Sequence, residues 1–285
     1  MALDGITTSC IAHELKSTLL GSRIDKIHQP TKDEIRIHMR GTNGNCVLLI
    51  SANPSHPRMH FTKTARENPM KAPLFCMVLR KHIAGGKIID IVQPDFERIL
   101  ILKITATNEM GDPVVKNLIL EIMGKHSNII LTEDTMEILD AIKRITYEKS
   151  SIREILPTRP YVFPPNQNKQ NPLELENFSQ FQEKLQTQKG QHLQEFILHS
   201  YMGISPVMAN AICTGGNLSP ALFCGELSEE LEKRLYDSLL QTMRSVKETA
   251  FTPTMYYDAK TNAILDFSAL PMLQFEDTQT YTKKI

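Results

Sequence analysis

The fold class is indicated by residues 34–50, which read Glu34-Ile35-Arg36-Ile37-His38-Met39-Arg40-Gly41-Thr42-Asn43-Gly44-Asn45-Cys46-Val47-Leu48-Leu49-Ile50. Apolar and polar side chains alternate strictly over the first seven residues, and a period of two is typical of a strand with one buried face. The Asn-Gly pair predicts a tight turn, so the apolar end of the stretch returns as the partner strand of a hairpin. We therefore expect an antiparallel sheet with one apolar face and one basic face, the basic face carrying Arg36, His38 and Arg40.

The residues around this hairpin extend the pattern into an α+β domain dominated by antiparallel strands. A helix is expected over 8–20, capped by Thr7, Thr8 or Ser9 and ended by Gly21. A second helix is expected from Pro73 through the apolar run 74–79 to Gly85-Gly86, with Arg80, Lys81 and His82 in its last turn. The remaining strands are predicted at 88–92, 97–102, 116–123, 128–132 and 137–145.

The composition changes between residues 157 and 172, where five prolines among polar residues predict a linker. Apolar residues then recur at helical spacing over 176–249, and Ser228 followed by two glutamates is typical of a helix start. Strand patterns resume at 255–257 and 263–267. We expect three segments, with the returning strands pairing with the first domain's sheet: a first domain over 1–172, an inserted helical domain over 173–250, and returning strands over 251–285.

One short motif in the helical part has two interpretations. Gly203-Ile204-Ser205-Pro206 leads through a glycine turn into a helix, as in helix-hairpin-helix modules, which aim backbone N–H groups at a phosphate. Ser205, however, stands where such a hairpin prefers a second glycine. An ordinary packing corner between two helices is the other interpretation, and the one that the motif favours.

The charges of the chain are balanced overall but distributed unevenly. Thirty-two Lys and Arg face 32 Asp and Glu, yet residues 1–100 hold 14 basic and 9 acidic residues. The bias is strongest over 56–87, where seven Lys or Arg residues face only Glu67. This segment is either a solvated surface without function or a phosphate-binding patch.

Other features bound the class of protein. No stretch approaches the roughly 18 apolar residues of a membrane span, and the N-terminus has no secretory signal, so we expect a cytoplasmic protein without membrane contact. The five cysteines are widely spaced and are expected to be free thiols, with Cys76 a buried apolar residue. The chain ends at Lys284-Ile285 without a stop signal, which suggests a fragment of something longer.

Common catalytic motifs are missing from the sequence. There is no glycine-rich nucleotide loop, no Gly-x-Ser-x-Gly, and His13-Glu14 is not followed by a second histidine one turn later. The carboxylates between 133 and 140 are most simply the solvated side of a hairpin. We therefore expect no catalytic residue, metal or cofactor, and no enzyme activity.

Four motifs in one order resemble the NFACT family. They are Met1-Ala2-Leu3-Asp4-Gly5-Ile6, Gly21-Ser22-Arg23-Ile24-Asp25-Lys26-Ile27-His28-Gln29-Pro30, Leu74-Phe75-Cys76-Met77-Val78-Leu79-Arg80-Lys81-His82 and Glu121-Ile122-Met123-Gly124-Lys125-His126-Ser127-Asn128. The resemblance implies a first domain similar to the N-terminal domain of formamidopyrimidine-DNA glycosylases, with an inserted helix-hairpin-helix domain. The family's coiled coil and C-terminal RNA-binding domain are not in this chain.

The resemblance also implies a function in ribosome-associated quality control. Bacterial members of the family bind a 50S ribosomal subunit obstructed by peptidyl-tRNA, so contacts with both tRNA and rRNA are implied. They recruit alanyl-tRNA for tailing the stalled chain with alanine. Peptide-bond chemistry then belongs to the ribosome, which agrees with the missing catalytic motifs.

Site residues follow from the same resemblance. The family's Glu-Ile-Met triplet, implicated in tRNA binding, matches Glu121, Ile122 and Met123, and its Asp-Arg pair appears here as Glu97-Arg98. A purely structural role is the alternative for each: a cross-strand charge pair for Glu97 and Arg98, and core packing for Ile122 and Met123. Candidate phosphate contacts are Arg58, Lys63, Arg80, Lys81 and Lys125.

Two other functions stay open as alternatives. A DNA glycosylase of this fold uses an N-terminal proline as its nucleophile, whereas the second and third residues are Ala2 and Leu3, and a zinc finger is missing. A surface adhesin that binds fibronectin, after an older name in the family, lacks a secretion signal.

Overall fold

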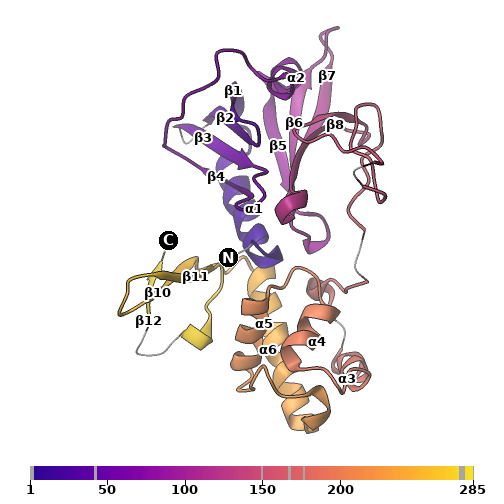
Figure 1. The fold of residues 1–285 in the computed structure, drawn as a ribbon, viewed down its shortest axis with the longest axis vertical. Coiled ribbons are helices and arrows are strands. Elements are labelled where there is room, and N and C mark those ends of the chain that lie inside the picture. Colours follow the sequence, from indigo (N-terminus) through magenta and orange to yellow (C-terminus); the bar gives the residue numbers. More distant parts are fainter. Residues whose placement is uncertain are drawn as a thin grey trace. The chain divides into compact units, whose positions relative to one another are not determined.

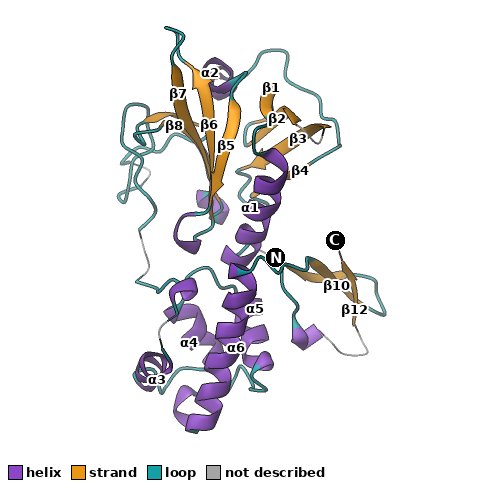
Figure 2. Ribbon diagram, turned by 180° about the vertical axis from the view of Figure 1, so that it is seen from behind, coloured by secondary structure: helices purple, strands orange, loops and turns teal. Residues whose placement is uncertain are grey.

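The computed structural model describes residues 3–41, 44–148, 150–165, 168–175, 177–275 and 280–284. The chain divides into two compact units, each of which collects separate stretches of sequence. We call residues 11–94 and 98–165 the sheet unit, and residues 1–10, 95–97 and 166–285 the helical unit. Figure 1 shows the chain coloured along its sequence, and Figure 2 shows it by secondary structure.

The described residues of the sheet unit form a nine-stranded antiparallel sheet in the order β4-β3-β2-β1-β5-β6-β7-β8-β9. Among the described residues the register of β1 with β5 is a single pair, Arg23 opposite Lys87, flanked by backbone hydrogen bonds such as Ile24 N–H to the Gly86 carbonyl. The strands therefore fall into two groups, β1–β4 and β5–β9, of which β1 to β8 are labelled in Figure 1. The strands are β1 (Arg23–Thr31), β2 (Glu34–Gly41), β3 (Gly44–Ser51), β4 (Arg58–Phe61), β5 (Lys87–Val92), β6 (Ile99–Thr107), β7 (Pro113–Glu121), β8 (Asn128–Glu133) and β9 (Ile138–Ala141).

The expected hairpin is confirmed. β2 pairs with β3 from Glu34 opposite Ser51 to Gly41 opposite Gly44, and Ile35, Ile37 and Met39 are buried. Its turn residues Thr42 and Asn43 lie outside the described part of the chain. The sequence pattern missed β1 and β4.

Two helices accompany the sheet. Helix α1 (Gly5–Leu19) begins three residues earlier than predicted, because the Asp4 carboxylate accepts a hydrogen bond from the Thr7 N–H at 2.8 Å and caps it. Helix α2 (Leu74–Ile83) was predicted correctly, buries Cys76 completely, and contacts β1, β6 and β9. It therefore packs against both groups of strands.

The helical unit is built around α3 (Phe178–Gln186), α4 (Leu193–Ser200), α5 (Pro206–Gly215) and α6 (Glu229–Lys247). Aromatic rings form its centre, where Phe181 meets Phe196 edge to face with centroids 5.6 Å apart. Leu235, Leu239 and Met243 of α6 pack against them at helical spacing.

The returning strands do not pair with the large sheet, contrary to expectation. β10 (Thr254–Asp258), β11 (Ile264–Ser268) and β12 (Thr280–Lys284) form a separate sheet in the order β11-β10-β12. The physical reason is local, because Tyr256 and Met272 are buried in the helical unit's core and the Met272 N–H donates to the Tyr256 hydroxyl.

The predicted linker is in part a fixed element of the sheet unit. The Ile138 N–H donates to the Arg159 carbonyl at 2.8 Å, and the Tyr161 N–H to the Met136 carbonyl at 2.7 Å. Within the predicted linker, the boundary between the two units falls after residue 165. Prolines thus prevent regular structure here without freeing the backbone.

Gly203 is a position where no other residue fits. Its φ is +69°, and an added Cβ would lie 2.6 Å from atoms of Phe96. We predict that Gly203→Ala lowers the free energy of unfolding by at least about 2 kcal/mol, measured by urea denaturation. Gly190→Ala is the matched control, because no atom lies within 4 Å of an added Cβ there. Equal stability of the two variants would contradict the packing described.

Candidate nucleic-acid interface

One side of the first four strands gathers basic side chains from different parts of the sequence. Residues directly opposite each other in an antiparallel sheet share a face. His28 lies opposite Arg36, which lies opposite Leu49 and then His60. One row on, Lys26 lies opposite His38. We call this side the basic face; its members are Lys26, His28, Arg36, His38, Arg58 and His60.

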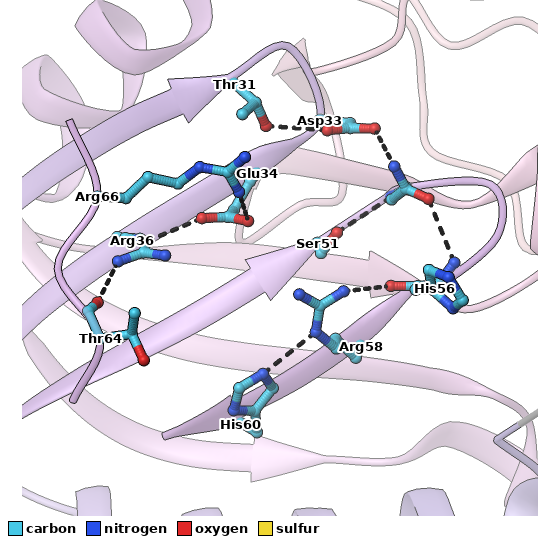
Figure 3. Close-up of polar contacts among 11 residues, drawn as sticks. Thr31, Asp33, Glu34, Arg36, Ser51, His56, Arg58, His60, Thr64 and Arg66 are labelled. Atoms are coloured by element: carbon cyan, nitrogen blue, oxygen red, sulfur yellow. Dashed lines mark hydrogen bonds and ion pairs between the residues drawn. The ribbon is translucent and has the colours of Figure 1, made fainter. Parts of the chain in front are cut away.

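The middle of the basic face is neutralised, which corrects the expectation of a uniformly basic surface. Arg36 is only 8% exposed, and its Nε donates to the Glu34 carboxylate at 2.8 Å (Figure 3). Its Nη1 donates to the Thr64 carbonyl, and Arg66 pairs with the same glutamate at 3.2 Å. The segment after β4 is thereby fastened to β2, and Arg36 is not open to a ligand.

Arg58 lies at the edge of this face between two histidines. Its Nε donates to the His60 ring at 3.2 Å, and its Nη1 donates to the His56 carbonyl at 2.8 Å (Figure 3). These contacts hold the partly exposed guanidinium in place. Lys63, two residues after β4, is exposed.

Arg80 and Lys81, the two predicted phosphate contacts on α2, bind different groups. Arg80 donates from Nε to the Ile27 carbonyl at 2.8 Å, which brings it to β1 beside His28. Lys81 forms an ion pair with Glu109 at 2.9 Å, and both side chains are well exposed. The basic segment of 56–87 is therefore not a single patch.

The Glu-Ile-Met triplet and Arg98 meet at one corner of the sheet. The Ile122 N–H donates to the Arg98 carbonyl at 2.9 Å, next to the pair formed by Ile99 and Glu121. Arg98 precedes β6 instead of lying in it, so the expected strand over 97–102 begins two residues too early. Glu97 belongs to the helical unit and Arg98 to the sheet unit.

Glu121 is fully buried, and its carboxylate is already bound. Arg153 donates to both of its oxygens at 2.7 Å, and the Tyr161 hydroxyl donates at 2.8 Å. Burial opposes the charge of Arg153, but the hydrogen bonds and charge of Glu121 outweigh it and raise its pKa. Burial, followed by the charge of Glu121, raises the pKa of Tyr161 far above its usual range. Glu121 thus has the geometry of a structural anchor.

The other two triplet residues differ in exposure. Ile122 is 2% exposed, whereas Met123 is partly exposed and packs against the cluster of Ile99, Ile119 and Tyr161. Core packing therefore describes Ile122 fully and Met123 in part.

The loop after the triplet lies beside the loop that precedes β4. Lys143 bridges them, because its Nζ donates to the Ala52 carbonyl at 2.6 Å and to the Ser127 carbonyl at 2.8 Å. A Cβ added to Gly124 would lie 3.9 Å from the Pro54 carbonyl oxygen. Lys125, which follows Gly124 in this loop, is exposed.

Polar groups of the motif at residues 203–206 are hydrogen-bonded to other residues of this chain. The Ser205 hydroxyl accepts from the Met208 N–H at 3.3 Å and donates to the Asp4 carboxylate at 2.8 Å. The Gly5 N–H donates to the Gly203 carbonyl at 2.8 Å. A carboxylate beside this helix start disfavours a phosphate there, so the contacts favour the packing corner.

Sequence reasoning missed Lys26, His28, Arg153 and Tyr161. Lys26 and His28 are two positions apart, which is the spacing of side chains on one face of a strand. This spacing could have placed both residues on the face that carries the basic residues of β2. Arg153 and Tyr161 lie in or near the proline-rich stretch, and no local sequence pattern there predicts a contact with Glu121. Across the described ranges, no three metal-binding side chains gather at one place, and no helix is long and apolar enough to cross a membrane.

Comparison with known families identifies the chain. Residues 4–285 match the model of the NFACT N-terminal and middle domains. The chain belongs to the NFACT family. It is 39% identical over 256 residues to the Rqc2 homolog RqcH of Bacillus subtilis, covering 90% of this chain and 43% of that protein. The archaeal Rqc2 homolog aRqcH of Methanocaldococcus jannaschii is 28% identical over 243 residues, which cover 83% of this chain and 34% of that protein. The chain thus spans less than half the length of these curated NFACT relatives.

Solved structures agree with the α+β fold. The fibrinogen binding protein from Staphylococcus aureus aligns over 100% of this chain and 95% of its own, at 28% identity and a TM-score of 0.81. The N-terminal part of the fibronectin/fibrinogen-binding protein from Streptococcus suis aligns over 98% of this chain and 94% of its own, at 29% identity and a TM-score of 0.78. MutM from Thermus thermophilus aligns at 14% identity and a TM-score of 0.37, a likeness too distant to say anything of this chain's chemistry.

The buried ion pair between Glu121 and Arg153 leads to a prediction about stability. Arg153→Met leaves the Glu121 carboxylate buried without its cation, so we expect the free energy of unfolding to fall by about 3 to 5 kcal/mol in urea denaturation. Lys16→Met is the control in the same unit, because the Lys16–Asp90 pair is half exposed and its loss should change stability by less than about 1 kcal/mol. If Arg153→Met lowered the free energy of unfolding by as little as Lys16→Met does, the Glu121–Arg153 pair would not be a structural anchor.

Proposed function

We propose that this chain is the tRNA-binding part of an adaptor in ribosome-associated quality control. In this proposal it recruits alanyl-tRNA to a 50S subunit obstructed by peptidyl-tRNA, and the ribosome itself joins alanine to the stalled chain. Family membership and the Rqc2-homolog relatives support the proposal. No residue of the chain is assigned a bond-making role.

The observation that carries the proposal is the meeting of two loops on the sheet unit. Arg98, Met123 and Lys125 lie at one corner, and Lys143 fixes this corner against the loop that leads to Arg58. Two loops that lie tens of positions apart in sequence are thereby side by side, and we infer that their cationic and apolar side chains form one surface. Folded RNA is bound by such surfaces, because cations contact phosphates and apolar or planar groups contact unpaired bases.

We infer different roles for the residues of this surface. In the proposal Arg58, Lys63 and Lys125 contact phosphates, and Arg98 and Met123 contact a loop base or ribose. Glu121 and Ile122 act indirectly, because both side chains are buried and hold the backbone of the corner. Glu97, which stands in the sequence where the family has an aspartate, is the remaining residue of the proposed interface.

Filter binding of the chain to alanine tRNA and to a DNA duplex of equal length tests the proposal. We expect tighter binding to tRNA, with an affinity that falls steeply as salt rises, since each phosphate contact releases counterions. Equal affinity for tRNA and DNA at every salt concentration would overturn selective tRNA recognition.

Arg98→Ala tests the corner itself. We expect this variant to bind tRNA about tenfold more weakly and to leave a shorter nuclease footprint, because a charged hydrogen-bond donor is lost. Arg234→Ala is the control, since Arg234 lies on α6 and pairs with Glu230. An Arg98→Ala footprint as long as the control's would remove Arg98 from the interface.

The competing function is binding of fibrinogen or fibronectin, after which two of the solved relatives are named. Immobilised fibronectin and fibrinogen, presented under the conditions of the tRNA experiment, discriminate between the two. We expect no saturable binding to either protein. Saturable binding that Arg98→Ala leaves unchanged would favour the adhesin.

A further inference from the structure

A second cationic cluster lies on the basic face, away from the corner of Arg98 and Met123. His28 and His38, on neighbouring strands, meet edge to face with ring centroids 5.2 Å apart. Arg80 of α2 reaches the same place, with its Nη2 3.5 Å from the Nδ1 of His28. Lys26 lies opposite His38 in the strand register. Three elements thus bring four basic groups together.

No described carboxylate forms an ion pair with any of these four residues. The charged groups that face His28 are Lys26 on its own strand, Arg36 and His38 on β2, and Arg80 on α2. Glu34 is bound to Arg36 and Arg66, and Asp25, which lines a pocket together with His38, lies 3.7 Å from Arg40. The positive charges of the cluster therefore have no ion-pair partner among the described residues.

Burial and the neighbouring positive charges act on His28 in the same direction. Burial lowers its pKa, and the charges of His38, Arg80 and Lys26 lower it further. Because arginine has only donors, the Nδ1 of His28 is the acceptor in their contact, and the neutral ring carries its hydrogen on Nε2. His28 thus offers a donor even when uncharged.

We propose that Lys26, His28, His38 and Arg80 form a phosphate-binding site for the backbone of the bound RNA. A phosphate bears the negative charge that the cluster lacks and has several acceptor oxygens for its donors. One member of the cluster, His38, also lines a pocket of about 810 Å³ together with Asp25, Phe61 and Lys63. A hollow of this size has room for the nucleoside attached to the phosphate. This site rests on the proposed function, because RNA supplies its phosphate.

The site has a pH signature that a fixed-charge contact lacks. A bound phosphate favours the charged form of His28 and so opposes the lowering of its pKa, and the complex takes up a proton that the free protein does not hold. Affinity must then rise as pH falls. We expect tRNA to bind about tenfold more tightly at pH 6 than at pH 8, since a pKa rise of one unit corresponds to one factor of ten.

The test measures tRNA affinity against pH and salt for wild type and variants. We expect the double variant His28→Gln/His38→Gln to lose the pH dependence, and Lys26→Gln to lower the salt slope by about one unit. His199→Gln, at an exposed position on α4, is the control and should keep the wild-type profile. A double variant that folds, as judged by its unfolding midpoint, and keeps the wild-type pH profile would overturn the site.

A titration with inorganic phosphate separates this site from the proposed function. We expect phosphate to shift the ring NMR resonances of His28 and His38, and to leave those of His199 unmoved. If wild type binds no tRNA at any salt concentration, the proposed function fails, and the titration alone decides the site. Unmoved resonances of His28 and His38 at saturating phosphate would overturn the phosphate site whatever the tRNA result.

Discussion

The buried contact between Glu121 and Arg153 is the constraint on which the candidate interface depends. A carboxylate with no exposed surface is stable only when its charge is matched and its oxygens accept hydrogen bonds, and Arg153 and Tyr161 meet both conditions. The contact ties the irregular segment before residue 165 to the end of β7. It thereby fixes the backbone on which Ile122 and Met123 follow, and to which Arg98 is bonded. An internal charge pair thus determines where surface residues stand.

Antiparallel register supplies the second principle of the interface. Side chains that are far apart in sequence share a face when their strands pair, and the rows of β1 to β4 place histidine beside arginine and lysine in this way. The same rows place Glu34 among them, and this glutamate neutralises Arg36. The basic face therefore divides into a compensated centre and uncompensated margins. Charge counted along the sequence does not reveal this division, because it depends on which strands are neighbours.

The sequence predicted those features that short-range patterns encode. The alternation over residues 34–40 and the Asn-Gly pair predict the β2–β3 hairpin, and the apolar run from Leu74 predicts α2. Strand β1 was missed because Pro30 and two register shifts break its alternation. The pairing of β10 was predicted wrongly, because partner choice depends on the apolar surface that Tyr256 and Met272 find in the helical core. The anchor of Glu121 lies 32 residues further along the chain, and no local rule connects the two positions.

The discontinuity of the helical unit has a consequence for biosynthesis. The sheet unit is complete once residue 165 has left the ribosome, and its strands pair mainly with neighbours in sequence, so it is able to fold while translation continues. Asp4 and Gly5 find Ser205 and Gly203 only some two hundred residues later. Residues 4 and 5 therefore reach these native contacts only after synthesis has passed residue 205, whereas the sheet unit has all of its residues forty positions earlier. The helical unit is thus the part of the chain whose folding has to await the later segment.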